Sequence, residues 1–85
     1  MIVLWRVSTA PRRVGFAVGR QVGGAVRRNR ARRRLREAYR GARPAAPPHV
    51  ELVVIGRRGA LSASLPTLVE EMRQAFQAMA APGAR

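Results

Sequence analysis

Arginine is the residue type in this chain with the most evident chemistry, and it is concentrated in one stretch. Ten of the seventeen arginines fall between Arg20 and Arg43. A guanidinium carries five N–H donors in a planar fork that fits the oxygens of a phosphate. Arginines three or four positions apart on a helix lie side by side, so neighbouring side chains can reach successive phosphates. This stretch therefore predicts a phosphate-binding surface.

The overall charge supports the same prediction. The formal net charge is +13, from seventeen arginines, no lysine, four glutamates and no aspartate. A positive field of this size attracts a polyanion, and nucleic acid is the first candidate. A GC-rich genome would favour arginine over lysine, but it would not explain why acidic residues are so few. An anionic membrane surface is the alternative partner.

Catalytic and metal chemistry by the protein itself is not predicted. The chain has no cysteine and one histidine, His49, so neither a disulfide nor a metal site of His and Cys ligands can form. The four glutamates are not grouped with a nucleophile and a base, so we expect no catalytic residue and no bound metal. The apolar residues 1–5 are too few for a signal peptide or a membrane span, which predicts a cytoplasmic protein.

The hydrophobic pattern predicts a single small α+β domain over residues 1–85, with elements in the order strand, strand, helix, strand, helix. Runs of β-branched and aromatic residues indicate the strands, and apolar residues three and four positions apart indicate the helices. Glycine and proline mark the ends of several elements. The predicted strands are residues 2–8, 14–18 and 50–55, and the predicted helices are residues 25–42 and a segment that opens near residue 64 and ends at residues 81–83.

The apolar faces of these elements predict how they pack. The first two strands are joined closely, so we expect an antiparallel hairpin. The third strand is nearly all apolar, which is typical of a strand buried on both faces. The first helix has a narrow apolar seam surrounded by arginine, and the second has a wide apolar face that should pack on the sheet. The seam consists of Ala31, Leu35, Ala38 and Ala42, and the wide face of Leu65, Leu68, Val69, Met72, Phe76 and Met79.

The segment from Arg20 to Glu37 resembles the signature of the protein component of bacterial ribonuclease P. It reads R-Q-V-G-G-A-V-R-R-N-R-A-R-R-R-L-R-E, and the family has a basic pair, Val-Gly, Ala-Val, Arg-Asn-Arg, a second basic pair and Arg-Glu. The segments at residues 2–8, 13–18 and 51–55 and the last helix also fit, so the resemblance spans nearly the whole chain. One departure is Gln21, which removes a cation from the first basic pair.

The resemblance implies a fold similar to the second domain of ribosomal protein S5. The third strand would follow the basic helix through a left-handed βαβ crossover, whereas the residue pattern alone predicts the common right-handed form. The resemblance also implies a helix before the first strand, forming one wall of a cleft over the sheet, and this chain starts at that strand. A start codon placed too far downstream or a shortened variant would explain this. The first explanation is favoured, since part of the sheet would otherwise be uncovered.

In function, the resemblance implies a subunit of the endonuclease that matures the 5′ ends of transfer RNAs. In that family the catalyst is an RNA that requires magnesium, and the protein binds this RNA and the 5′ leader of precursor tRNA. The residues implied to contact the catalytic RNA are Arg20, Arg28, Asn29, Arg30, Arg32, Arg33 and Arg36. The leader would lie in the cleft, where Trp5 and Phe16, each also a candidate core residue, could stack on unpaired bases. No cofactor, small-molecule substrate or membrane is implied for the protein alone.

Two other functions would share this composition. A ribosomal protein is also small, basic and α+β, but it would lack the ordered Arg-Asn-Arg segment and would bind ribosomal RNA instead. A membrane-surface peptide would combine arginine with many large apolar residues, and residues 25–42 contain only Val26, Leu35 and Tyr39 of that kind. Binding to the catalytic RNA of ribonuclease P distinguishes these functions.

Overall fold

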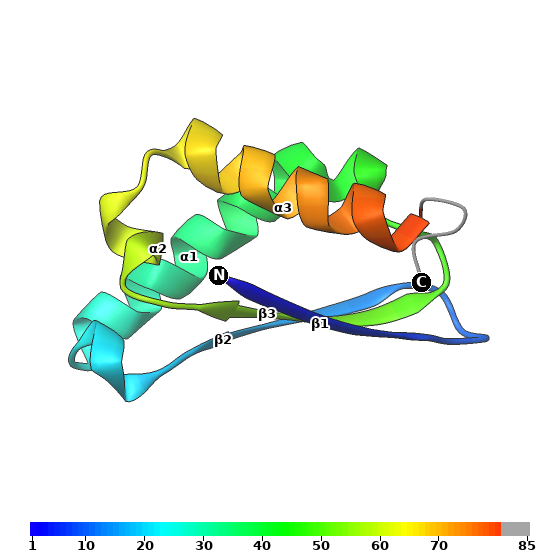
Figure 1. Cartoon of the computed structure of the whole chain (residues 1–85). Helices are drawn as coiled ribbons and strands as arrows, with labels where there is room; N and C mark the ends of the chain where they lie inside the picture. The colour runs from blue at the N-terminus through cyan, green and yellow to red at the C-terminus, as the bar shows by residue number, and fades with distance from the viewer. Residues whose placement is uncertain (81–85) are drawn as a thin grey trace.

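The computed structural model describes residues 1–80, which form a three-stranded sheet with two long helices on one face (Figure 1). This confirms the predicted α+β class and the order of the strands and main helices. The sequence pattern does not predict the short helix α2, and the predicted helix end at residues 81–83 lies outside the described residues. The elements are β1 (Ile2–Val7), β2 (Arg13–Val18), α1 (Ala25–Ala42), β3 (Val50–Gly56), α2 (Gly59–Ser62) and α3 (Leu65–Ala80), with 3₁₀ turns η1 (Arg20–Val22) and η2 (Arg43–Ala45).

The predicted hairpin between the first two strands is wrong, because β3 lies between them in the order β1-β3-β2. β1 pairs with β3 antiparallel, with Trp5 opposite Leu52, and β2 pairs with β3 in parallel, with Phe16 opposite Val54. A connection of a few residues can span the roughly 10 Å of two strand spacings, so its shortness does not force β1 and β2 to be neighbours. β3 takes the centre because residues such as Leu52 and Val54 are buried beneath the helices.

The chain passes from β2 to β3 through α1, which lies above the sheet in Figure 1. In that view β1 is nearest the reader and β2 farthest, so this parallel connection turns in the left-handed sense. The hand agrees with the family resemblance and is opposite to the general rule for βαβ units. The beginning of α1 consequently lies beside η1 and α2 at one end of the molecule.

The hydrophobic core fills the space between the sheet and the two long helices. Both predicted apolar faces are confirmed, because the seam of α1 is fully buried and α3 buries Met72 and Phe76. The opposite face of the sheet is open, and Leu4 and Val53 on it are 54% and 40% exposed. β3 is therefore buried on one face only, which corrects the interpretation of residues 50–55 as buried on both.

Gly56 brings the end of β3 directly against α1. A Cβ at this position would lie only 2.8 Å from Leu35 Cδ1, closer than real side-chain contacts, so glycine permits the approach. Arg57 and Arg58 follow at once and therefore leave the sheet at the end of the molecule where α1 begins.

Candidate nucleic-acid interface

A tight turn after η1 fixes the start of α1. Gly23 has a φ of 134°, a conformation that L side chains rarely adopt, and a Cβ there would collide with the Arg27 side chain. Gly24 occupies the N-cap position without a side-chain hydrogen bond, and the first turn of α1 contains no acidic residue. The partial positive charge at the helix N-terminus therefore adds to that of the arginines, and no local carboxylate offsets it.

The acidic side chains that form salt bridges lie away from α1. Glu51 pairs with Arg6 at 2.5 Å, Glu70 pairs with Arg73 at 2.5 Å, and Glu71 lies 3.8 Å from the amino group of Met1. Within residues 1–80, no arginine of α1 forms a salt bridge. The arginines of α1 are thus not compensated by salt bridges within the described residues.

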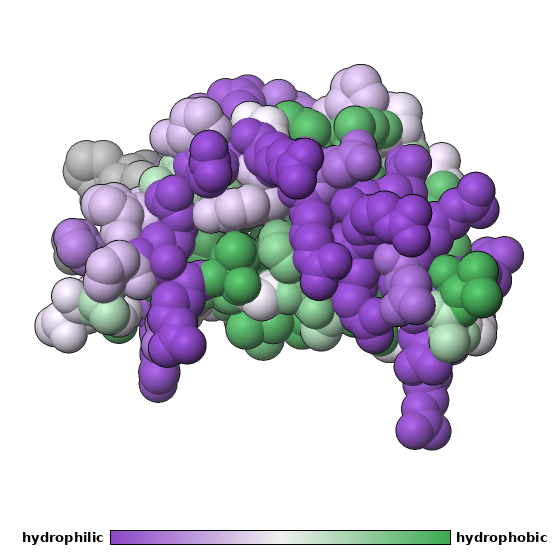
Figure 2. All heavy atoms as spheres, turned by 180° about the vertical axis from the view of Figure 1, so that it is seen from behind, coloured by the Kyte–Doolittle hydropathy of each residue, from purple (hydrophilic) through white to green (hydrophobic). Residues whose placement is uncertain are grey.

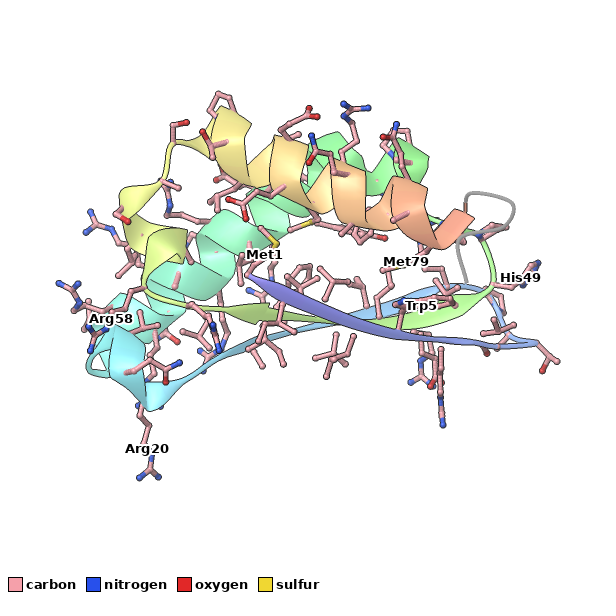
Figure 3. All side chains as sticks on the ribbon, viewed as in Figure 1. Met1, Trp5, Arg20, His49, Arg58 and Met79 are labelled. Carbon is pink, nitrogen blue, oxygen red and sulfur yellow. The ribbon has the colours of Figure 1, made fainter. Side chains whose placement is uncertain are left out.

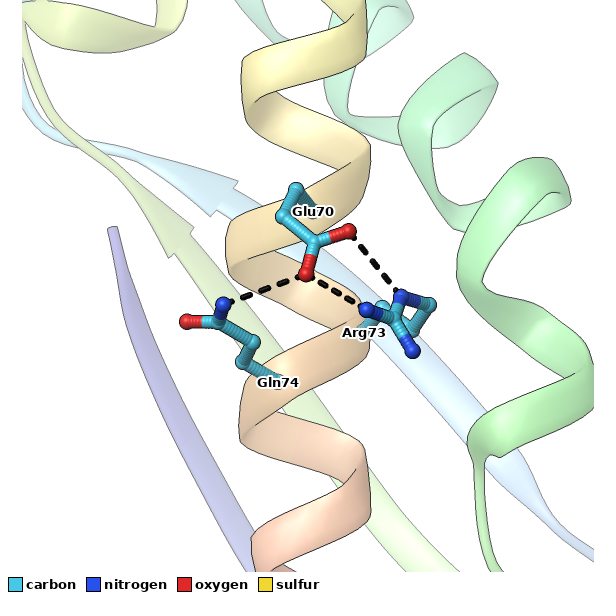
Figure 4. A network of polar contacts seen from close by, with 3 residues as sticks. All are labelled: Glu70, Arg73 and Gln74. Carbon is cyan, nitrogen blue, oxygen red and sulfur yellow. Dashed lines mark hydrogen bonds and ion pairs between the residues drawn. The ribbon is translucent and has the colours of Figure 1, made fainter.

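On α3, the positive charge of Arg73 is neutralised by the carboxylate of Glu70 on the same helix (Figure 4). Arg73 donates from Nε to Glu70 Oε1 at 3.0 Å, and Gln74 donates from Nε2 to Glu70 Oε2 at 3.1 Å. The hydrogen bond from Arg73 is the main cause that lowers the pKa of Glu70 below its ordinary value, and the same bond raises the pKa of Arg73. Both groups stay ionised at neutral pH, so the charge of this arginine is compensated within α3.

The residues expected to contact RNA are gathered on one helix and the turn before it. Six of them lie on α1, and Arg20 projects from η1 at the same end of the molecule (Figure 3). Asn29 Oδ1 accepts a 2.6 Å hydrogen bond from Arg32 Nη1, which orients that guanidinium. Seen from behind Figure 1, the side on which α1 and β2 lie, hydrophilic side chains cover much of the surface (Figure 2). The exposed members of the set are Arg20, Asn29, Arg30, Arg33 and Arg36, and the half-buried members are Arg28 and Arg32.

Arg28 is held at a cost in stability. Its Nε is buried and has no hydrogen-bond partner among the described residues. Leaving a buried donor unsatisfied costs about 1–3 kcal/mol. A residue that destabilises the free protein in this way is typical of a functional site.

Replacing Arg28 by methionine is expected to stabilise the protein and to weaken its binding to RNA. The substitution removes the unsatisfied donor and keeps most of the aliphatic volume, so the free energy of unfolding should rise by about 1 kcal/mol. Thermal unfolding measures this gain, and Arg36→Met is the matched control because Arg36 is exposed on the same helix. Equal shifts in the melting temperature for the two variants would contradict the prediction.

Trp5 lines an apolar groove between β1 and α3. The groove has a volume of about 240 Å³ and is also lined by Val3, Ala75, Ala78 and Met79. Trp5 is 46% exposed, and Figure 3 shows it near Met79, in the space between strand and helix. An aromatic ring with this exposure is available for stacking.

Phe16 lies on the same side of the sheet but in different surroundings. Its ring packs edge-on against Tyr39 of α1, with the centroids 5.8 Å apart, and Tyr39 packs in the same way against Phe76 at 6.0 Å. β3 separates Phe16 from Trp5, since the two residues lie on opposite outer strands. The structure therefore does not bring the two aromatics into one groove, and it places Phe16 at the edge of the core.

Three further arginines line the basic surface, although the family resemblance did not imply them as RNA contacts; Arg27 and Arg34 fall within the predicted arginine stretch, and Arg58 lies outside it. Arg27, Arg34 and Arg58 line a cavity of about 660 Å³ together with Arg30. Arg27 and Arg34 are seven positions apart and so share one side of α1, a signal that the sequence contained. Arg58 carried no such signal, because its place beside α1 depends on how β3 packs.

No helix within residues 1–80 is long and apolar enough to cross a membrane. In the same residues, no group of three or more His, Cys, Asp or Glu side chains is placed to hold a metal ion.

The sequence is similar to known proteins over nearly its whole length. The model of the family described as Ribonuclease P matches residues 1–80. The ribonuclease P protein component of Symbiobacterium thermophilum is 45% identical over 75 residues, which are 88% of this chain and 65% of that protein. The same component of Gluconacetobacter diazotrophicus is 43% identical over 82 residues, 95% of this chain and 71% of that protein. This chain thus spans about two thirds of the length of these relatives.

The fold is similar to solved structures with the same name. The RNase P protein from Thermotoga maritima superimposes with a TM-score of 0.76 and 29% identity, over 88% of this chain and 73% of that one. The Staphylococcus aureus RNase P protein, at 21% identity, shows the shared fold alone, with a TM-score of 0.66 over 92% of this chain and 72% of that one. Sequence and fold together show that the chain belongs to the ribonuclease P protein component family.

Proposed function

We propose that this protein binds the catalytic RNA of ribonuclease P through α1 and η1 and assists in the 5′ maturation of precursor tRNA. The observation that carries the proposal is the arginine surface of α1, none of whose arginines is paired with a carboxylate within residues 1–80. Such a surface suits the phosphate backbone of a folded RNA, and family membership identifies which RNA that would be.

The protein would contribute charge and position to the reaction. Guanidinium groups next to the RNA phosphates reduce their mutual repulsion, which lets the RNA fold tightly at a lower magnesium concentration. Magnesium would be bound by the RNA, and the protein would supply no ligand to it. The RNA and its metal ions would therefore hold both the attacking water and the scissile phosphate. We expect the protein to act in the cytoplasm.

The groove at Trp5 is the part of the structure that best suits the unpaired 5′ leader. Its walls are apolar, and the exposed indole offers a flat face on which a base can stack, an interaction worth about 1–3 kcal/mol per base. Phe16 is a weaker candidate, because Tyr39 covers one edge of its ring. We therefore assign leader contact to Trp5 before Phe16.

The proposal is tested by cleavage of a precursor tRNA by a bacterial ribonuclease P RNA at low magnesium, with and without the 85-residue chain. We expect the protein to increase the rate and to keep cleavage at the mature 5′ end. Circular dichroism on the same sample establishes that the chain is folded. A folded chain that neither stimulates cleavage nor binds this RNA more tightly than a ribosomal RNA fragment would overturn the proposal.

A further inference from the structure

We infer that the cavity at the beginning of α1 is a second binding site for a phosphate group of an RNA backbone, beside the predicted RNA surface with which it shares Arg30. The inference rests on the proposed function for the identity of the RNA, but the site itself is argued from its geometry. Its arginines come from two elements far apart in the sequence, since Arg27, Arg30 and Arg34 lie on α1 and Arg58 follows β3. Among the described residues that line the cavity, none is acidic.

Main-chain carbonyl groups hold three of these arginines in place. Arg27 donates from Nε to Val22 O at 3.0 Å, and Arg58 donates from Nε to Gln21 O at 3.3 Å. Arg34 donates from Nε to Ala60 O at 2.7 Å and from Nη2 to Ala63 O. The three guanidiniums are thus anchored by the backbone of the turns around the cavity and not by carboxylates.

Anchoring of this kind leaves each guanidinium both charged and able to donate. A carbonyl oxygen does not neutralise the positive charge, and a guanidinium has five N–H groups, of which these bonds use one or two. Side chains that are already fixed lose less conformational entropy when a ligand binds, so a given contact yields more affinity. The arrangement is therefore preorganised for an anion.

The size of the cavity favours a backbone segment over a small free ion. The cavity is partly open to solvent, and its volume of about 660 Å³ is within the roughly 300–1,000 Å³ range of ligand pockets. A phosphate with its neighbouring sugar fits that volume, whereas inorganic phosphate would fill a small part of it. The four arginines of the cavity repel one another, and the negative charge of a bound phosphodiester would relieve this repulsion.

This site lies on a different side of α1 from part of the predicted RNA surface. Arg28 and Arg32 share the side of the helix that carries Tyr39, which packs on Phe16 of β2. Arg27 and Arg34 share the side that faces α2, as the bonds from Arg34 to the backbone of residues 60 and 63 show. One nearly flat RNA surface cannot reach both sides of a helix, so the protein would contact two separate backbone segments.

A titration of the free protein tests the site without any assumption about function. The probe is a ribodinucleotide with a 5′ phosphate, and the signals followed by NMR are the arginine Nε–H groups. We expect the signals of Arg27 and Arg58 to shift and to saturate, and the signal of the exposed Arg57 to move little. Equal, non-saturating shifts of all three signals would overturn the inference.

Arg58→Gln tests the site in the RNA complex, and Arg57→Gln is the matched control, because it removes the same charge from the neighbouring position. Each phosphate contact contributes about 0.7–0.9 to the slope of log affinity against log salt. We expect Arg58→Gln to reduce that slope by about one contact and Arg57→Gln to leave it unchanged. Arg27→Gln is a second variant that should act in the same direction. Equal slopes for all four proteins, both in binding the catalytic RNA and in binding of precursor tRNA to the assembled complex, would overturn the inference.

Two arms of the binding experiment separate the possible sources of the phosphate. If it belongs to the catalytic RNA, Arg58→Gln lowers the slope for binding that RNA alone. If it belongs to precursor tRNA, the slope changes only when precursor tRNA binds the assembled complex. If the proposed function is wrong but the phosphate site exists, the wild-type chain will show no preference for the RNA of ribonuclease P. The dinucleotide will still bind the cavity in that case.

Discussion

Replacing Arg32, Arg33 and Arg36 together by glutamine is expected to remove most of the stimulation of precursor tRNA cleavage while leaving the protein folded. Arg33 and Arg36 are exposed on α1, and Arg32 is half-buried and donates a hydrogen bond to the side-chain amide of Asn29. Losing three phosphate contacts should lower the salt slope for binding the catalytic RNA by about 2 to 3. Binding measured at several salt concentrations, together with cleavage rates at low magnesium, gives both quantities.

Stability should move in the other direction in this triple variant. Arg32 and Arg36 are four positions apart and Arg33 and Arg36 three apart, and like charges at these spacings destabilise a helix by about 0.2–0.5 kcal/mol per pair. We therefore expect an unchanged or slightly higher melting temperature. The matched control replaces Arg13, Arg43 and Arg57, which are exposed and lie outside α1. Equal losses of affinity in the two triple variants would mean that net charge, and not the surface of α1, governs binding.

Phe76→Ala is expected to destabilise the protein by about 3–5 kcal/mol, the usual cost of removing a buried phenylalanine ring. Phe76 is completely buried and packs edge-on against Tyr39, so it joins α3 to α1 at the centre of the core. A domain of this size has roughly 4–13 kcal/mol of stability in total. The variant should therefore melt at least 10 °C lower, at about 4–8 °C per kcal/mol, and should bind RNA poorly because it is partly unfolded.

Urea unfolding of the same variant provides the measurement, and Gln77→Ala provides the control. Gln77 is the next residue on α3 and is exposed, so its replacement should change the free energy of unfolding by less than about 0.5 kcal/mol. Adding the catalytic RNA should restore part of the helical signal of Phe76→Ala, because a ligand that binds only the folded state stabilises it. A loss below about 1 kcal/mol would show that the interior repacks around the missing ring.

Features that depend on neighbours in the sequence were predictable from the sequence. The seam of α1 and the apolar face of α3 follow from the 3.6-residue period, and both are buried where the pattern places them. The concentration of arginine on one helix can also be predicted from the sequence, because it depends only on residue type and on the helical period. The resemblance of residues 20–37 to a known family added the left-handed crossover, which no residue pattern would have favoured.

Features that depend on contacts between distant residues were decided by the tertiary structure. β1 and β2 are close in sequence, but β3 separates them, because the strand with the best-covered residues takes the central position. Trp5 and Phe16 have similar sequence contexts, yet Trp5 lines the groove between β1 and α3 whereas Phe16 packs edge-on against Tyr39 of α1.

The basic cavity combines residues that the sequence predicts with a residue that only the tertiary structure brings there. The sequence by itself determined that α1 is covered with arginine, because residue type and helical period are local properties. Only the tertiary structure decided that Arg58 joins Arg27 and Arg34, since the approach of Gly56 to Leu35 brings the end of β3 beside α1. The bond from Arg58 to the carbonyl of Gln21 joins residues 37 positions apart, and chain packing alone creates a contact at that separation.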